Sequence, residues 1–196
     1  MCRKGEFMQI QPLTVGIVST NCYILSADEN AAECVVIDPG DEAKRILRAV
    51  GSRRIAAILL THGHFDHIGA VAGLKGEDTP VLIHGLDAPM LEDPGLNGSR
   101  LLLRQDWKSV PATDLLQEGS RRTFAGLDIE VLHTPGHTPG SVCYRIGDQL
   151  FTGDTLFEHG WGRTDLPGGD EHALFASLRR LMPLTRTLPI HPGHDT

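Results

Sequence analysis

The chain has 196 residues, of which 40% are hydrophobic, so it is long enough for one domain with a sizeable core and short for two. Its 18 Lys and Arg residues are outnumbered by 25 Asp and Glu residues, and the formal net charge of -7 disfavours nucleic acid as a partner. No apolar stretch approaches the length of a membrane span, and the N-terminal residues lack the apolar core of a signal peptide. We therefore expect one domain over residues 1–196, a cytoplasmic location, and neither nucleic acid nor a membrane as a partner.

Short β-type runs alternate with helical patterns along the chain, and this alternation is typical of an α/β fold. Every cluster of His or Asp residues lies at the end of a β-type run, which supports the same assignment. The early runs are expected to form hairpins joined by short turns. Strands are predicted over residues 9–15, 22–26, 34–37, 56–60, 81–84, 127–132, 142–146, 150–152 and 187–190.

A first helix is predicted over residues 41–50, with an acidic first turn and Gly51 at its end. Its apolar residues recur on one face, so this helix should cover one side of a sheet. The apolar face consists of Ala43, Ile46, Leu47 and Val50.

Residues 93–120 contain Pro and Gly and form the least regular part of the chain. They follow the predicted strand over residues 81–84 and carry no clear helical or strand period. We interpret them as a surface loop or as a flap over a site.

A second helix is predicted over residues 171–182, capped by Asp170 and ended by Pro183. It is amphipathic, so it should also cover one side of a sheet. Its inward face is predicted to consist of Leu174, Phe175, Leu178, Leu181 and Met182.

The four cysteines are far apart in the sequence and include no Cys-x-x-Cys pair. They therefore indicate neither a disulfide framework nor a cysteine zinc site. We interpret them as reduced structural thiols. They are Cys2, Cys22, Cys34 and Cys143.

The densest group of metal-binding side chains lies in residues 62–67, His-Gly-His-Phe-Asp-His, directly after an apolar run. Three imidazoles and a carboxylate suit borderline divalent metals, which bind neutral His nitrogen and carboxylate oxygen. His62 and His64 are two apart on extended backbone and project the same way, whereas Asp66 and His67 follow the bend and can serve a second ion. The alternative is a set of ordinary polar loop residues, but such crowded ionisable groups need the charge compensation that a metal supplies.

Three further segments place His or Asp residues after a β-type run. Residues 133–141 contain two histidines four apart, but the Pro and Gly residues between them exclude a regular helix and predict a rigid turn. Residues 152–155 place Asp154 at a strand end, and residues 191–195 place His194 beyond a Pro-Gly turn. Each segment alone is a weak signal because Gly-Asp turns are frequent, but their order and common placement make the set specific.

This set of motifs resembles the metallo-β-lactamase superfamily. The superfamily motif His-x-His-x-Asp-His is matched at residues 62–67, and residues 38–40, Asp-Pro-Gly, are similar to its first motif. The resemblance extends over about residues 13–195. It implies an α/β fold of the metallo-β-lactamase type, a four-layered αββα sandwich with the metals at one edge of the two sheets.

Within the superfamily, the chain is similar to the glyoxalase II branch, the hydroxyacylglutathione hydrolases, and especially to the compact single-domain bacterial type. The similarity is carried by residues 134–138, 152–157, 162–165 and 192–194. It implies that the chain binds two divalent metal ions, with Zn as the expected metal and Fe or Mn as the other options. One ion would be held by His62, His64 and His137, and the other by Asp66, His67 and His194. Asp154 would bridge the two ions.

Three other histidines and one further carboxylate are not expected to bind the metals. His133 and His191 each precede a ligand turn, so we expect them to be structural or to support a neighbouring ligand. His84 ends a predicted strand and is expected to be an ordinary polar residue. Asp38 is expected to orient a ligand or a loop through hydrogen bonds.

The chemistry implied by this resemblance is hydrolysis at a carbonyl group. Two ions about 3.5–4 Å apart can hold a bridging water that ionises to hydroxide near neutral pH. Asp66 would orient this nucleophile and accept a proton as the catalytic carboxylate. A thiolate, from a thiol with a pKa of about 8.5, leaves without a strong proton donor, so a small-molecule thioester such as S-D-lactoylglutathione is the expected substrate.

Arg163 is the one candidate substrate-binding residue outside the metal set. It lies where the larger glyoxalase II enzymes have a substrate-contacting Lys, and its guanidinium could hold a carboxylate in bidentate fashion. The alternative is that Arg163 pairs with Asp165 and only stabilises the loop.

Two other functions remain open at this point. A persulfide dioxygenase shares the ligand motif but uses one iron, which the counterparts of His62, His137 and Asp154 would hold. A non-catalytic metal-binding domain would need a closed site without an open position for water. Metal content and oxygen uptake distinguish the hydrolase from the dioxygenase.

Overall fold

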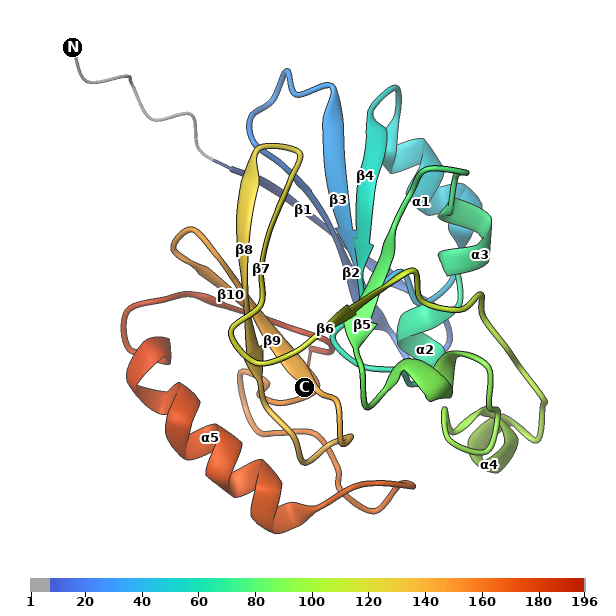
Figure 1. The fold of residues 1–196 in the computed structure, drawn as a ribbon, viewed down its shortest axis with the longest axis vertical. Coiled ribbons are helices and arrows are strands. Elements are labelled where there is room, and N and C mark those ends of the chain that lie inside the picture. The colour runs from blue at the N-terminus through green and yellow to red at the C-terminus, as the bar shows by residue number, and fades with distance from the viewer. Residues whose placement is uncertain (1–7, 196) are drawn as a thin grey trace.

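The computed structural model describes residues 8–195 and contains two β-sheets with helices on their outer faces (Figure 1). The strands are β1 Gln9–Val15, β2 Thr20–Ser26, β3 Glu33–Ile37, β4 Arg54–Leu59, β5 Val81–His84, β6 Asp114–Leu116, β7 Arg121–Phe124, β8 Leu127–His133, β9 Val142–Ile146, β10 Gln149–Gly153 and β11 Ile190–Pro192. The helices are α1 Ala43–Val50, α2 Phe65–Ile68, α3 Val71–Leu74, the 3₁₀ turn η1 Ala88–Leu91, α4 Ser99–Leu103 and α5 Glu171–Thr185.

The two sheets differ in how their strands run. The first has the order β1-β2-β3-β4-β5-β6, in which β1, β2 and β3 pair antiparallel and β3 to β6 pair parallel. The second has the order β11-β10-β9-β8-β7 and is antiparallel except for the β10–β11 pair. Because β3, β4 and β5 run parallel, the loops that follow them leave the same edge of the first sheet.

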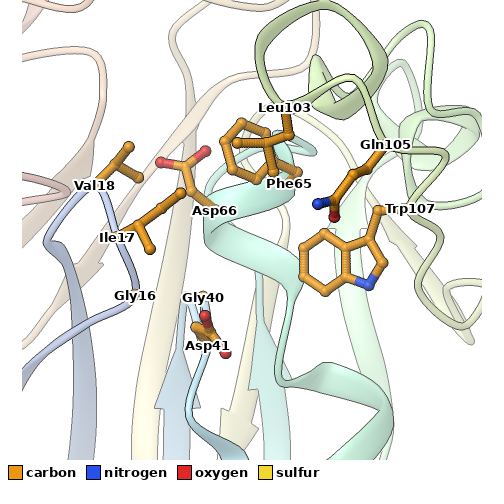
Figure 2. Close-up of a pocket in the computed structure, with 10 residues that line it drawn as sticks. All are labelled: Gly16, Ile17, Val18, Gly40, Asp41, Phe65, Asp66, Leu103, Gln105 and Trp107. Carbon is orange, nitrogen blue, oxygen red and sulfur yellow. The ribbon is translucent and has the colours of Figure 1, made fainter.

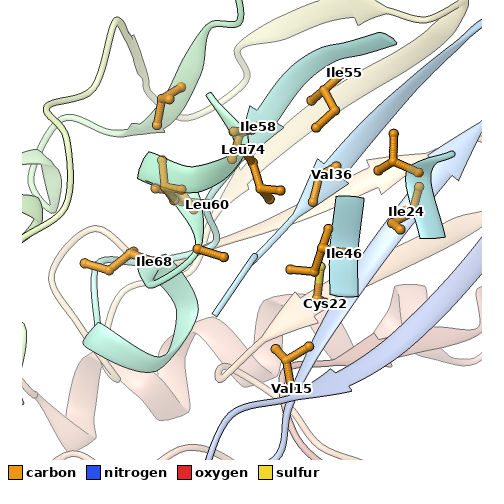
Figure 3. Close-up of a cluster of buried hydrophobic side chains, with 14 of the residues drawn as sticks. Val15, Cys22, Ile24, Val36, Ile46, Ile55, Ile58, Leu60, Ile68 and Leu74 are labelled. Carbon is orange, nitrogen blue, oxygen red and sulfur yellow. The ribbon is translucent and has the colours of Figure 1, made fainter. Parts of the chain in front are cut away.

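Three clusters of buried side chains fill the spaces between four layers. One lies between the first sheet and helices α1 and α3, and it includes Val36 of β3 and Ile46 of α1 (Figure 3). A second lies between the sheets and contains Val35 of β3 with Tyr144 of β9. Since successive side chains of a strand point to opposite faces, β3 contributes alternate residues to the two clusters. A third cluster joins the second sheet to α5 around Leu181. The expected four-layered αββα sandwich is confirmed.

Most predicted strands are present within a residue or two, because their buried apolar runs carry the signal. Two strands were not predicted: β6 has only three residues, and β7 is largely polar and partly exposed. The prediction of a strand over residues 187–190 is corrected, since β11 covers Ile190–Pro192 and pairs with β10.

The predicted start of the first helix is wrong. Helix α1 begins at Ala43, because Glu42 has a left-handed backbone with φ 56° and cannot continue the helix. The Asp41 carboxylate accepts a hydrogen bond from the Glu42 N–H at 2.6 Å, so the acidic residues precede the helix instead of forming its first turn. Leu47 was also placed on the inner face, but it is exposed.

The sequence predicted that Pro183 ends the second helix, and this prediction is wrong. Helix α5 continues to Thr185 with Pro183 inside it. The turn beyond the proline is stabilised because Leu184 and Leu188 pack against the buried cluster around Leu181. Asp170 caps the helix as expected and accepts a hydrogen bond from the Ala173 N–H at 3.0 Å. The inner face is confirmed for Leu174, Leu178 and Leu181, whereas Met182 is exposed.

The cysteines of the described region are buried and free, as expected; Cys2 lies outside the described residues. Burial raises the pKa of the Cys143 thiol to about 11 and also raises the pKa values of Cys22 and Cys34. At pH 8 all three are therefore protonated and unreactive. We expect an alkylating reagent to label none of the three in the native protein and all three after unfolding, as read by peptide mass mapping. Fast labelling of any of them before unfolding would contradict this arrangement.

Within residues 8–195, no helix combines the length and the apolar character that crossing a membrane requires.

Candidate metal centre

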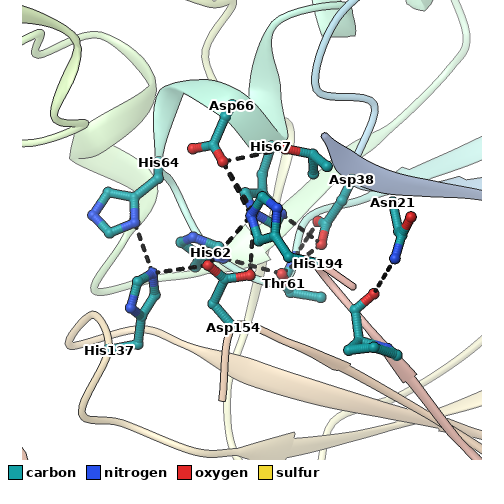
Figure 4. Close-up of polar contacts among 12 residues, drawn as sticks. Asn21, Asp38, Thr61, His62, His64, Asp66, His67, His137, Asp154 and His194 are labelled. Carbon is teal, nitrogen blue, oxygen red and sulfur yellow. Dashed lines mark hydrogen bonds and ion pairs between the residues drawn. The ribbon is translucent and has the colours of Figure 1, made fainter. Parts of the chain in front are cut away.

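The loops that leave the ends of several strands meet at one edge of the sandwich and bring the predicted metal ligands together (Figure 4). Four of them follow β4, in the loop and first turn of α2, and the others follow β8, β10 and β11. All seven lie in one cluster, so residues up to 132 positions apart in sequence become neighbours. They are His62, His64, Asp66, His67, His137, Asp154 and His194.

One trio of this cluster consists of His62, His64 and His137, all buried. Each offers one nitrogen, and these nitrogens lie within 4.8 Å of one another. The closest approach is 2.9 Å, between Nδ1 of His64 and Nε2 of His137. This is the first of the two ligand sets that the family resemblance implied.

A second trio consists of Asp66, His67 and His194. Nε2 of His194 lies 3.3 Å from Oδ2 of Asp66 and 3.3 Å from Nε2 of His67. Burial alone would lower the pKa of His67, but the carboxylates of Asp154, Asp66 and Asp38 raise it well above its ordinary value. These carboxylates therefore favour a positive charge at this point, whether a proton or a metal ion.

Asp154 lies between the two trios. Its Oδ1 is 3.3 Å from Nε2 of His67, and its Oδ2 is 3.5 Å from Nε2 of His137. Burial would raise the pKa of Asp154, but these imidazoles and His194 lower it below its ordinary range, so the side chain is a carboxylate. Oδ2 also lies 3.6 Å from Nε2 of His194, so the Asp154 carboxylate is close to nitrogens of both trios, as expected of a bridging ligand.

The cluster fits metal ions because three of its buried polar atoms have no hydrogen-bond partner in residues 8–195: Nε2 of His62, Nε2 of His64 and Oδ1 of Asp154. Leaving such atoms unpaired is costly unless another group binds them. Burial, followed by neighbouring histidines, lowers the pKa of His62 well below its ordinary value and that of His64 to about 3. Both imidazoles are therefore neutral, which is the form that coordinates a metal.

Asp38 follows β3 and supports the cluster through hydrogen bonds, as expected from the sequence. It accepts hydrogen bonds from the backbone N–H of Thr61 at 2.7 Å and from the Thr61 hydroxyl at 2.6 Å. Its Oδ2 also lies 3.0 Å from Nδ1 of His67. Because a histidine that donates from Nδ1 presents Nε2 to a metal, Asp38 fixes the orientation of His67.

The other histidines singled out in the sequence lie outside the cluster. His84 and His133 stack on each other with ring centroids 4.1 Å apart, and Nε2 of His133 lies 2.9 Å from the Pro139 carbonyl oxygen. Nε2 of His191 lies 2.8 Å from the Gln149 side-chain oxygen. These contacts agree with the structural interpretation.

Arg163 lies at the rim of the cluster, beside His137. Its carbonyl oxygen is 2.7 Å from Nδ1 of His137, whereas its guanidinium makes a bidentate pair with Asp165 at 2.6 and 2.7 Å. This pair lowers the pKa of Asp165 to about 2. The backbone of Arg163 thus supports a candidate ligand, and its side chain is held in the loop by Asp165.

Asp87 is a buried residue near the cluster that the sequence did not reveal. Its Oδ1 accepts from the Gly140 N–H at 2.6 Å, and its Oδ2 accepts from the Thr138 hydroxyl at 2.6 Å and the Gly63 N–H at 3.2 Å. The carboxylate therefore ties the His62–His64 loop to the His137 turn. A single Asp in an irregular segment carries no local signal of such a role.

Removing this carboxylate is expected to destabilise the protein. In Asp87→Ala, the Gly63 and Gly140 N–H groups lose a buried acceptor, which should lower the free energy of unfolding by about 3 kcal/mol. Urea unfolding of the variant and the parent chain measures this difference. The matched control is Asp93→Ala, because Asp93 also accepts a backbone hydrogen bond but is exposed. Equal losses in the two variants would show that burial of Asp87 is not the cause.

Comparison with known sequences identifies the family. The metallo-beta-lactamase superfamily matches residues 15–194 of the chain. YqgX of Bacillus subtilis (strain 168), named a probable metallo-hydrolase, is 37% identical over 193 residues that cover 95% of this chain and 90% of that protein. The hydroxyacylglutathione hydrolase GloC of Haemophilus influenzae is 36% identical, with coverage of 96% and 92%.

Solved structures agree with the sequence match. BLEG-1, a B3 metallo-beta-lactamase, is 39% identical with a TM-score of 0.89, covering 96% of this chain and 92% of that one. TTHA1623 in a di-iron-bound form is 42% identical with a TM-score of 0.82 and coverage of 95% and 92%. ETHE1 from Myxococcus xanthus is 31% identical with a TM-score of 0.74 and coverage of 96% and 76%. The chain therefore belongs to the metallo-β-lactamase superfamily.

Proposed function

We propose that this protein is a metal-dependent hydrolase that cleaves thioesters, with S-D-lactoylglutathione as the first substrate to test. The observation that carries the proposal is the cluster of five histidines and two aspartates, in which Asp66 also lines a surface pocket. The relative GloC, which matches nearly the full chain, is named a hydroxyacylglutathione hydrolase and supports the substrate class.

The proposed ligand assignment follows the two trios. One divalent ion would be held by His62, His64 and His137. The other would be held by Asp66, His67 and His194, and Asp154 would bind both ions. Bound there, such ions supply an activated water and polarise the carbonyl oxygen of the substrate.

Asp66 is the member of the cluster suited to act on protons. Its side chain is 15% exposed and lines the pocket, so it can reach a water or a substrate that enters. Its Oδ2 accepts a hydrogen bond from the Thr20 hydroxyl at 3.2 Å, which orients the carboxylate. Burial raises the pKa of Asp66, but His67 and His194 outweigh this effect and lower it, so the group is ionised and able to accept a proton.

A thioester suits this site because its leaving group needs little help. A thiol has a pKa of about 8.5, so the thiolate departs without a strong general acid. Cysteine nucleophiles do not compete among residues 8–195, because the thiols of Cys22, Cys34 and Cys143 are buried and have raised pKa values.

A persulfide dioxygenase is the second candidate, and the similarity to ETHE1 favours it. That reaction would use one iron, held by His62, His137 and Asp154. Since the two candidates share the ligand motif, the support for the hydrolase comes from GloC, which is 36% identical and is matched over 92% of its length. A purely structural metal site is disfavoured because the cluster adjoins a pocket that admits small molecules.

The test is an anaerobic assay of S-D-lactoylglutathione hydrolysis. The protein is loaded with Zn, Fe(II) or Mn, and the loss of the thioester bond is measured. Turnover that a chelator abolishes and added metal restores is the expected result. If no metal form hydrolyses the thioester and the iron form consumes oxygen with glutathione persulfide, the hydrolase proposal is wrong and the dioxygenase replaces it.

A further inference from the structure

A pocket of about 280 Å³ lies directly beside Asp66, and no part of the substrate has yet been assigned to it (Figure 2). Ile17 and Val18, in the β1–β2 turn, form one side, and Leu103 and Trp107, in and after α4, form the other. Asp66 lies between the two sides. An arm of a substrate whose carbonyl group is attacked near Asp66 can therefore extend into this pocket.

The lining is mainly apolar, and part of this apolar surface is exposed to water, which is energetically unfavourable. Ile17 is 79% exposed and Val18 is 44% exposed, although both could have been polar in a surface turn. The turn is held in place, since Ser19 has φ 60° and its N–H donates to the Gly16 carbonyl at 3.3 Å. Contact with an apolar group would remove both side chains from water.

The lining offers an anionic occupant no basic side chain among the described residues. Asp41 and Asp66 are the ionisable side chains of the pocket, and no Lys, Arg or His belongs to its lining. A carboxylate or phosphate placed there would meet the Asp41 carboxylate and no basic side chain of the lining. An uncharged hydrocarbon group suits the pocket instead.

The His137 side of the cluster carries the exposed Arg163–Asp165 pair, which holds the loop there. Two arms leave the carbonyl carbon of a thioester, the acyl chain and the thiol carrier. A polar carrier suits the Arg163 rim, which leaves the apolar pocket for the acyl chain.

We propose that the pocket between Ile17 and Trp107 binds the acyl chain of the thioester, and that the protein prefers longer apolar acyl groups to acetyl. This assignment rests on the proposed thioesterase function and specifies its substrate class. It separates the two rims of the site into an acyl side and a thiol side.

The direct test compares acetyl, butanoyl and hexanoyl thioesters of one neutral carrier, N-acetylcysteamine, with the metal-loaded protein. Full burial of a methylene corresponds to about a fourfold gain in binding, so kcat/KM should rise at least about 10-fold from acetyl to hexanoyl in this partly open pocket. A smaller ratio would overturn the assignment.

A variant in the turn checks that this pocket is responsible. Ile17→Asp adds a third carboxylate to the lining, and Ile17 is exposed, so the fold should tolerate the change. The hexanoyl-to-acetyl ratio should fall close to one. The matched control is Leu115→Asp, because Leu115 is 56% exposed on β6 and does not belong to the lining. A ratio that Ile17→Asp leaves unchanged would overturn the assignment.

Binding of ketone analogues separates this inference from the proposed function. In these analogues a methylene group replaces the thioester sulfur, so the scissile C–S bond becomes a C–C bond. The analogues therefore bind without being hydrolysed. The hexanoyl ketone should bind at least about 10-fold more tightly than the acetyl ketone, and Ile17→Asp should remove the difference. If this holds but no thioester is hydrolysed, the acyl pocket stands and the thioesterase function fails. Equal binding of the two ketones overturns the pocket.

Discussion

Replacing Asp154 with alanine is expected to reduce kcat on the thioester substrate by about 10³-fold, in the range seen when a charge-stabilising group leaves an active site. The physical reason is position: Oδ1 of Asp154 faces His67 and Oδ2 faces His137, so its loss removes the one carboxylate shared by both trios. Steady-state kinetics and metal content per chain, measured on the same preparation, check the result.

The fold should survive this change, because Asp154 ends β10 in a loop and contributes no hydrophobic core. Circular dichroism and thermal unfolding of Asp154→Ala provide that control. Asp148→Ala removes a carboxylate from the exposed β9–β10 turn and should keep full activity. Full activity of Asp154→Ala with both metals bound would show that the bridging assignment is wrong.

The second large effect is expected from a single added methyl group, in Gly193→Ala. A Cβ atom at this position would overlap Oδ1 of Asp154 and would lie 2.8 Å from Cε1 of His67. The backbone cannot move away, because the Gly193 N–H donates to the Gly153 carbonyl at 2.9 Å and the Gly193 carbonyl accepts from the Asn21 N–H at 2.7 Å. We expect metal affinity to fall about 10- to 100-fold and turnover about 100-fold.

Metal titration and kinetics of Gly193→Ala test this expectation. Gly85→Ala is the matched control, because a Cβ atom there meets nothing within 4 Å and Gly85 has no left-handed φ. It should change neither quantity. Unaltered metal affinity in Gly193→Ala would contradict this expectation. It would mean that Asp154 and His67 can be displaced without loss of metal binding.

The candidate ligands could be predicted from sequence because each belongs to a short motif that ends a strand. Residues 62–67 carry four of them after the buried run of β4, and the Pro-Gly turns at residues 135–136 and 192–193 fix the backbone before His137 and His194. Strand ends and proline-glycine turns are local properties, so they are legible without knowledge of the fold. The placement of the motifs at a common edge came only from the family resemblance.

The ends of the helices were less predictable, because packing competes with local preference. Pro183 is a strong local signal for a helix end, yet the contacts of Leu184 and Leu188 with the buried cluster carry α5 past it. Leu47 and Met182 follow a helical apolar period, but they are exposed. Periodicity identifies a face and does not determine how much of that face the sheet covers.

The sequence by itself thus determined which side chains form the candidate metal centre and that they end strands of an α/β sandwich. Only the tertiary structure decided that Asp87 joins two of the ligand loops and that Ile17 and Trp107 face each other across a pocket beside Asp66. The physical reason is that such contacts join segments remote in the chain. They depend on how the two sheets and their loops pack, which no local preference for helix, strand or turn encodes.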